Sequence, residues 1–425
     1  MKFWSIVFLC LHISIFISCN NYIEPEEQKE PEEQEKSYNA SILWEREIYS
    51  AGNNHAIPLI DDRYLYFSSL LIPGGGSNIV KIDMENGKVI WESERITEGF
   101  DQNPHKIGMY IFQPVSSGFI YVFSDINGDL AATIRLGDID ASLFYISVYN
   151  YELAVVSGPY LFWGNAPRSS EYSRGLMRFD STKIDFSINS DEVQIIPPDL
   201  FWTNPLRPSI STNILSEDGI IYFLTGSYLS DDPERVSLLV ALDAETGIVI
   251  WEQKVSYSNG WDYYSLVLNN DKLFIIEKNL ACFNKFTGAL VYKIPELTYR
   301  PYNTKFSLTT LHNNFFYYFC HPETLICINA DTSEQVWHTL LKRDILDDDY
   351  LYSYSSPRVY NDMLFILYHS GLLLYNSNDG EFIGIDKLFK GNKNSFTTTY
   401  KDAFVFTGSA KTRDSIYLTA VEFKF

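Results

Sequence analysis

The sequence predicts an all-β fold, an eight-bladed β-propeller of four-stranded antiparallel blades, with seven blades as the alternative count. A strand–turn–strand pattern recurs along the chain, and no segment has the hydrophobic period of a helix. Four successive copies end at Trp251, Tyr292, Trp337 and Gly384, so their ends are 41, 45 and 47 residues apart. Periods of roughly 40 to 50 residues that contain several short strands are typical of propeller blades.

Each position of the repeat has a structural task. Asp or Asn opens the turn, because its short side chain can bond the backbone two residues on. Gly closes the turn, because the chain there needs a positive φ. An aromatic residue four positions later lies on the outgoing strand, where burial of its ring between blades contributes on the order of 3 kcal/mol. The five copies are 79–91, 239–251, 280–292, 325–337 and 372–384.

These aromatic positions predict blade-docking residues. Two copies depart from the pattern, since Ser333 replaces the turn glycine and Gly384 stands where the aromatic ring is expected. The predicted docking residues are Trp44, Trp91, Trp251, Tyr292 and Trp337.

The blades are expected to follow one another to the end of the chain, where the last blade lacks its outgoing strand. The segment 42–48, which contains Trp44, supplies such a strand near the N-terminus. We expect it to complete the last blade and close the ring, which removes open sheet edges. The predicted blades are 55–93, 109–136, 144–198, 208–255, 263–294, 306–341, 354–388 and 396–425, of which the third matches the repeat poorly.

The pattern aliphatic-x-Asp-x-x-Thr-Gly-x-x-x-Trp, clearest at 241–251, resembles the repeat of quinoprotein-type (PQQ-repeat) propellers. If this chain were one of the enzymes of that family, the resemblance would imply a quinone held between a vicinal disulfide and a Trp, with a Ca²⁺ ion beside it. This sequence has no adjacent cysteine pair. Cys282 and Cys327 occupy the repeat position of Ala241, where a small buried residue belongs. We therefore expect core thiols, no cofactor and no enzyme activity.

The first residues predict export. Residues 1–18 form a signal peptide with one lysine and an apolar stretch too short to span a bilayer comfortably. The stretch ends in Ser18-Cys19, which resembles the bacterial lipobox and predicts lipidation of Cys19; an ordinary signal peptide with an incidental cysteine is the alternative. Residues 19–40 form an acidic tether that cannot bury apolar area. The propeller then spans residues 41–425.

Charge and motifs exclude several kinds of site. A net charge of −21 argues against nucleic-acid and anionic-lipid partners, since phosphate binding needs clustered Lys and Arg. The run 125–129 is similar to a Ca²⁺ loop, but Leu136 stands where a bidentate Glu is required, so a hairpin turn is predicted and no metal site. Cys320 and Cys327 flank a predicted turn, where they are compatible with a disulfide or with two free thiols.

The irregular segment 163–203 contains candidate interface residues, because aromatic and Arg side chains in loops are typical interface anchors. The alternative is that its aromatics belong to the core of a poorly recognised third blade. The candidates are Trp163, Arg168, Tyr172, Arg174 and Trp202.

Lipobox, tether and blades together resemble the B subunit of the β-barrel assembly machinery, a non-enzymatic lipoprotein propeller. The resemblance implies a monomeric cell-envelope scaffold that binds protein partners, reaches the membrane only through its lipid and lies at the outer membrane, on its periplasmic or surface face. Two alternatives remain open: a surface lipoprotein that binds a glycan or host ligand, and a quinoprotein dehydrogenase.

Overall fold

Eight β-sheets account for nearly all of the described secondary structure, as the repeat predicts. The computed structural model describes residues 39–49, 58–70, 76–100, 103–115, 117–137, 154–164, 175–203, 209–210, 212–226, 236–256, 265–276, 280–294, 309–320, 324–341, 357–368, 371–386, 397–401, 403–409 and 415–424. By contacts the chain divides into Met1–Lys36 and Ser37–Phe425, and every described strand belongs to the second unit. Within the described residues the one helical segment is the 3-10 turn η2 (Ser181–Lys183).

The strands of the first four blades follow the order of the chain, with one exception. One strand that lies between two strands of blade 3 in the sequence pairs with blade 2 instead. Blade 1 consists of β2 (Leu59–Asp61), β3 (Tyr64–Leu70), β4 (Ser77–Asp83) and β5 (Lys88–Glu92). Blade 2 consists of β6 (His105–Ile107), β7 (Tyr110–Pro114), β8 (Phe119–Ser124) and β9 (Leu130–Arg135), with β13 (Val193–Ile195) added outside β9. Blade 3 consists of β10 (Ala154–Ser157), β11 (Tyr160–Gly164), β12 (Leu176–Asp180) and β14 (Asp199–Trp202). Blade 4 consists of β15 (Ser209–Ile210), β16 (Leu215–Glu217), β17 (Ile220–Gly226), β18 (Val236–Asp243) and β19 (Val249–Ser256).

The last four blades each have four strands in the described residues. Blade 5 consists of β20 (Ser265–Asn269), β21 (Lys272–Ile276), β22 (Leu280–Asn284) and β23 (Leu290–Ile294). Blade 6 consists of β24 (Thr309–His312), β25 (Phe315–Cys320), β26 (Thr324–Asn329) and β27 (Gln335–Leu340). Blade 7 consists of β28 (Arg358–Tyr360), β29 (Met363–Tyr368), β30 (Gly371–Asn376) and β31 (Phe382–Asp386). Blade 8 consists of β32 (Thr397–Tyr400), β33 (Ala403–Ser409), β34 (Ser415–Lys424) and β1 (Asn39–Tyr49).

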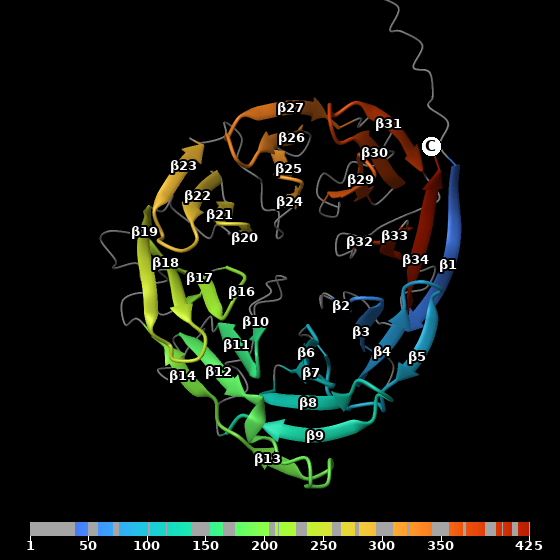
Figure 1. Cartoon of the computed structure of the whole chain (residues 1–425). Helices are drawn as coiled ribbons and strands as arrows, with labels where there is room; N and C mark the ends of the chain where they lie inside the picture. The colour runs from blue at the N-terminus through green and yellow to red at the C-terminus, as the bar shows by residue number, and fades with distance from the viewer. Residues whose placement is uncertain are drawn as a thin grey trace, which may run out of the picture. The chain divides into compact units, whose positions relative to one another are not determined.

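Within the second unit the blades form a closed ring, with the first strand of each blade near the centre and the last at the periphery (Figure 1). Closure follows the prediction, because β1 pairs antiparallel with β34 and places Trp44 opposite Ala420. Eight buried apolar clusters fill the contacts between neighbouring blades, and each combines residues of two adjacent blades. The eight-bladed count and the all-β class are therefore confirmed.

The predicted docking rings lie on the turns of the next blade. At Gly87, Gly128, Gly288 and Gly380, which all have positive φ, an added Cβ would come within 2.5–2.6 Å of the neighbouring indole ring. Each ring also donates a hydrogen bond to a turn carbonyl: Trp44 to Met84 (3.0 Å), Trp91 to Asp125 (2.9 Å), Trp251 to Lys285 (2.9 Å), Tyr292 to Ala330 (2.6 Å) and Trp337 to Ser377 (3.0 Å).

The ring is missing at two places, and at both the next blade has no tight turn to receive it. Gly384 of blade 7 faces blade 8, whose third and fourth strands are β34 and β1, from opposite ends of the chain. Ala132 of blade 2 occupies the corresponding register position opposite Val122, and it faces blade 3, where residues 181–198 separate β12 from β14. A docking ring thus occurs where a turn exists for it.

Blade 3 docks on blade 4 through two residues instead of one Trp. The ring of Phe201 lies 3.3 Å from the Cβ position of Gly247, and the guanidinium of Arg178 stacks 4.3 Å from the centroid of that ring. Arg178 also donates to the backbone carbonyl of Glu245, at 2.6 Å. The pair supplies the ring and the hydrogen-bond donor that a single Trp or Tyr side chain provides at the junctions that have a docking ring.

Residues 181–198, here called the blade-3 insertion, turn back onto blade 2. Its strand β13 pairs parallel with β9, and Ile184 and Ile196 are buried in the core between blades 2 and 3. The insertion therefore covers the interface at which blade 2 lacks a docking ring. The predicted third blade, 144–198, was wrong at its end, because this insertion delays the outer strand to 199–202.

Candidate functional site

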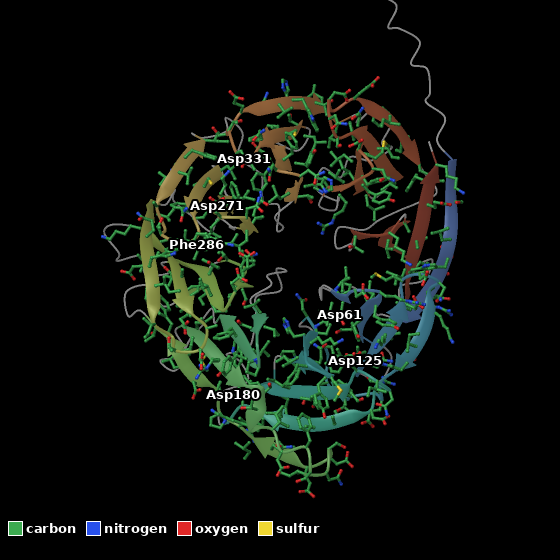
Figure 2. The ribbon with its side chains drawn as sticks, viewed as in Figure 1. Asp61, Asp125, Asp180, Asp271, Phe286 and Asp331 are labelled. Carbon is green, nitrogen blue, oxygen red and sulfur yellow. The ribbon has the colours of Figure 1, made fainter. Side chains whose placement is uncertain are left out.

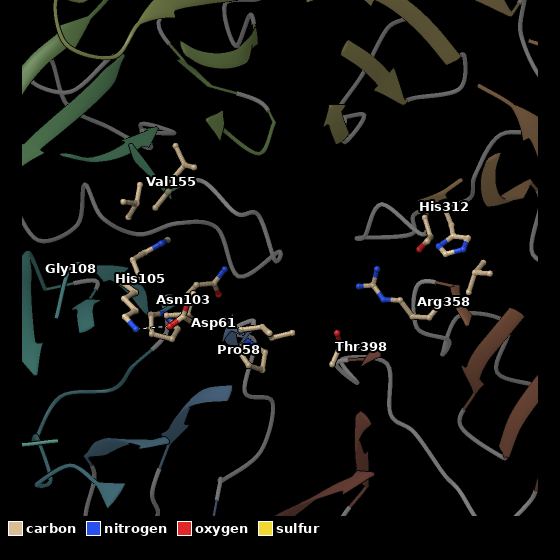
Figure 3. A pocket seen from close by; sticks show the side chains of 17 residues that line it. Pro58, Asp61, Asn103, His105, Gly108, Val155, His312, Arg358 and Thr398 are labelled. Atoms are coloured by element: carbon tan, nitrogen blue, oxygen red, sulfur yellow. Dashed lines mark hydrogen bonds and ion pairs between the residues drawn. The ribbon is translucent and has the colours of Figure 1, made fainter. Parts of the chain in front are cut away.

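The inner strands surround a cavity of about 860 Å³ near the centre of the ring (Figure 3). Its lining includes Asp61 and His105 on one side and His312, Arg358 and Thr398 on another. Burial lowers the pKa of His105 to about 4, so its ring is neutral at pH 7. The cavity therefore combines a few polar groups of mixed charge with apolar strand residues.

Beside the cavity an ion cluster joins blades 1 and 2. Asp125 accepts hydrogen bonds from Lys81 (2.7 Å), Tyr66 (2.5 Å) and Lys106 (2.9 Å), and Lys106 also contacts Asp61. Burial raises the pKa of Asp125, but these hydrogen bonds outweigh it and hold the pKa below its usual value. Figure 2 labels Asp61 and Asp125 near this junction. The carboxylate of Asp125 is thus used in fixing two blades together.

The structure places 125–129 in the predicted hairpin turn, with the Gly128 N–H donating to the carbonyl of Ser124 at 2.9 Å. Among the described residues, no group of three His, Cys, Asp or Glu side chains could hold a metal ion. Cys282 and Cys327 are buried free thiols in the cores between blades, on β22 and β26. The described residues thus contain neither a vicinal disulfide nor a group of three potential metal ligands, the two features that the resemblance to quinoprotein enzymes implied for the quinone and Ca²⁺.

The open question about Cys320 and Cys327 is settled by the register of β25 and β26. Cys327 lies opposite Tyr317, whereas Cys320 lies opposite Thr324 at the other end of the pair. This offset of three residues along the strands, roughly 10 Å, exceeds the Cα–Cα distance that a disulfide spans. Cys327 is accordingly a free thiol, whose pKa burial raises to about 12.

The predicted interface residues are only partly placed. Trp163 lies on β11 and is 6% exposed within the core between blades 2 and 3, so its assignment to a surface was wrong. Trp202 lies on β14 and packs edge-on against Phe223, with ring centroids 5.0 Å apart. Trp163 therefore follows the alternative of a core aromatic, whereas Trp202 is partly buried and packs against the core between blades 3 and 4. Arg168, Tyr172 and Arg174 lie outside the described residues, as do the signal peptide, Cys19 and most of the tether.

Exposed apolar side chains mark two surfaces that sequence reasoning missed. One is the blade-3 insertion, where Phe186, Val193 and Ile195 are 41%, 48% and 68% exposed. The other, here called the blade-4/5 patch, lies where Trp251 docks on the turn that contains Phe286 (labelled in Figure 2). This patch consists of Ile248, Val249, Ile250, Phe286, Leu290 and Val291, each 38% to 66% exposed. Apolar residues next to Asp191-Glu192 and Pro197-Pro198 were the signal for a short strand in the insertion.

No described helix has the length and hydropathy needed to cross a bilayer.

Comparison with known proteins identifies the fold. No protein-family model and no curated protein sequence matches the chain. Among solved structures, BamB from Moraxella catarrhalis is similar with a TM-score of 0.59 and 13% identity, over 91% of this chain and 98% of that one. Quinohemoprotein alcohol dehydrogenase from Comamonas testosteroni gives 0.62 and 11%, over 90% and 76%. The computationally designed Ika8 protein gives 0.54 and 10%, over 88% and 98%. The chain thus has the β-propeller fold that BamB shares with the quinoprotein dehydrogenases.

Proposed function

We propose that this protein is a non-catalytic scaffold of the cell envelope, anchored by lipid on Cys19 and binding protein partners with the propeller. More specifically, the scaffold would take part in outer-membrane protein assembly and lie on the periplasmic or surface face of the outer membrane. The propeller acts as a monomer in this proposal, and the acidic tether spaces it from the bilayer.

The observation that carries the proposal is the extent of the likeness to BamB. The two chains match over 98% of BamB and 91% of this protein, whereas only 76% of the alcohol dehydrogenase is covered. The part of the dehydrogenase left over has no counterpart in the match. The lipobox-like Ser18-Cys19 adds an independent reason for an envelope location.

The surface of the ring agrees with a binding role. Contiguous apolar surface on a soluble protein commonly marks an interaction site. The blade-4/5 patch and the blade-3 insertion both present exposed apolar residues. Rigid blades with exposed rims are suited to holding partners in a fixed arrangement.

Affinity purification of the tagged, lipidated protein from envelope membranes tests the proposal. Envelope proteins should be recovered with the wild type at levels above an untagged control, and Cys19→Ser should move the protein out of the membrane fraction. Recovery of no envelope protein above background would refute the scaffold function.

A separate measurement tests the dehydrogenase alternative. Added pyrroloquinoline quinone and Ca²⁺ should leave the thermal unfolding midpoint unchanged and produce no dye-linked alcohol oxidation. A raised midpoint together with alcohol oxidation would replace the scaffold by an enzyme.

A further inference from the structure

The outermost strand of blade 2 is an open sheet edge. In this sheet the strand order is β13-β9-β8-β7-β6, so no described strand covers the outer side of β13. The N–H of Ile196 donates to the carbonyl of Arg135 on β9, at 2.9 Å. Because successive peptide groups of a strand point to opposite sides, the N–H and C=O groups of Val193 and Ile195 point away from β9. Two residues therefore offer backbone donors and acceptors to an additional strand.

The side chains of β13 separate cleanly by face. Val193 and Ile195 are 48% and 68% exposed, whereas Gln194 and Ile196 are 7% and 8% exposed. Natural proteins usually protect open edges with Lys, Pro or a bulge. The β9–β13 register is uninterrupted, and the exposed residues of β13 are apolar. The edge is short and ends before Pro197, yet Val193 and Ile195 carry none of these protections, and backbone groups beside apolar side chains can bind a further strand.

This edge is held rigidly although it belongs to a long insertion. Gln194 accepts from the Asp185 N–H at 3.0 Å and donates to the Asp185 carbonyl at 2.9 Å. The ring of Phe186 stacks on Tyr110 with centroids 4.3 Å apart. Ile196 is anchored in the core. Because β13 is already ordered, a partner would lose little free energy in ordering it on binding.

Charge selects the kind of segment that fits. Asp191 and Glu192 are exposed and directly precede Val193. Asp199, by contrast, is already paired with Arg178 at 3.3 Å and with Lys183 at 3.7 Å. The whole chain carries a net charge of −21, so a basic segment is also attracted at long range. At the other end Pro197 limits the edge, since proline has no N–H to offer.

We propose that the free edge of β13 binds an extended segment of a protein partner by strand addition, the segment combining apolar residues at alternate positions with Lys or Arg beside Asp191 and Glu192. This inference rests on the scaffold function proposed above and names its docking mode and partner chemistry. The residues that carry it are Val193 and Ile195, with the two acidic side chains as the charge determinant.

A synthetic peptide provides the test. The probe is a fluorescein-labelled Lys-Lys-Val-Thr-Ile-Thr-Val peptide, with two controls: the same peptide N-methylated at alternate amides, and a version with Glu in place of Lys. The full mature protein should bind the probe in fluorescence anisotropy. Both control peptides should bind with an affinity at least about tenfold lower. Failure of the probe to bind, or equal binding of the N-methylated peptide, would overturn strand addition.

Variants locate the binding. Ile195→Pro removes an outward N–H that the fold does not use, so it should abolish binding while leaving the thermal midpoint near that of the wild type. Asp191→Asn with Glu192→Gln should weaken binding and flatten its salt dependence. Leu340→Ser, on the outermost strand of blade 6 and 64% exposed, is the control and should bind like the wild type. Equal binding by Ile195→Pro would place the peptide elsewhere and refute the proposal.

Two further measurements separate the alternatives. Sedimentation that shows a dimer abolished by Ile195→Pro would assign the edge to a second copy of this chain and overturn the partner assignment. Membrane purification with wild type and Ile195→Pro distinguishes the two proposals. If both proteins recover the same partners, binding at the β13 edge is refuted and the scaffold function stands. If neither recovers a partner, the scaffold function itself is refuted.

Discussion

The interlock between an indole ring and the turn glycine of the next blade can be measured at Trp337 and Gly380. Gly380 has a φ of +76°, and a Cβ added there would lie 2.5 Å from Cε3 of Trp337. The indole is 8% exposed and is held by its hydrogen bond to Ser377. Gly380→Ala should therefore suffer both backbone strain and a steric clash, while Trp337→Ala should remove the clash.

The expected magnitudes follow from these contacts. An L-residue in the left-handed region costs about 1–2 kcal/mol, and forcing extra atoms into a packed site costs about 1–3 kcal/mol more. Gly219 has the same φ of +76° with no atom within 4 Å of its Cβ position, so Gly219→Ala isolates the backbone cost. Trp337→Ala alone should cost about 3–5 kcal/mol. Gly380→Ala should then cost about as much as Gly219→Ala once Trp337→Ala is present.

Urea unfolding followed by near-ultraviolet circular dichroism supplies the free energies for this double-mutant cycle. The coupling between the two sites should amount to about 1–3 kcal/mol. If Gly380→Ala costs no more than Gly219→Ala in the wild type, or costs the same with and without the Trp337 ring, the interlock does not exist as described.

Three further predictions concern buried groups. Trp163→Ala should lower the free energy of unfolding by about 3–5 kcal/mol, measured by urea unfolding, since the ring is a core residue; an unchanged midpoint would return it to the surface. Burial lowers the pKa of His105 from 6.5 to about 4, so between these pH values the unfolded chain binds a proton that the folded chain does not. The free energy of unfolding should therefore fall as the pH drops from about 6.5 toward 4, by at most about 3 kcal/mol. His105→Gln should flatten that part of the stability–pH curve, and an unaltered curve would contradict the assignment. Burial raises the pKa of Cys282 to about 11 and of Cys327 to about 12, so peptide mass spectrometry should find both unlabelled by iodoacetamide at pH 8 until denaturant is added; rapid labelling of the native protein would show that they are accessible.

Much of the architecture could be predicted because blade contacts recur locally. The Asp or Asn, Gly and Trp positions lie within one hairpin, so the docking roles of residues such as Trp91 and Trp251 could be inferred from spacing alone. The missing strand of the last blade could be matched to the segment around Trp44 for the same reason. Blade 3 could not be delimited, because its docking function is divided between Arg178 and Phe201, which are 23 residues apart in sequence.

The candidate binding surface depended on information that the sequence does not carry locally. Trp163 and Ile195 are both large apolar residues near irregular segments, yet one is buried and the other exposed. Which of them faces solvent depends on the return of the blade-3 insertion onto β9, a contact between residues about 60 positions apart (Val193 and Thr133). Long-range pairing of this kind leaves only a weak sequence pattern.

The sequence by itself determined the all-β class, the hairpin repeat, the closure of the ring and the docking rings, because these follow from turn chemistry and from interactions repeated at a fixed spacing. Tertiary structure alone decided that Gly384 and Ala132 have no turn to cover, that Cys327 stays a free thiol, and that β13 forms an open edge. Those features depend on which surfaces the folded ring brings together, and burial there is set by neighbours distant in sequence.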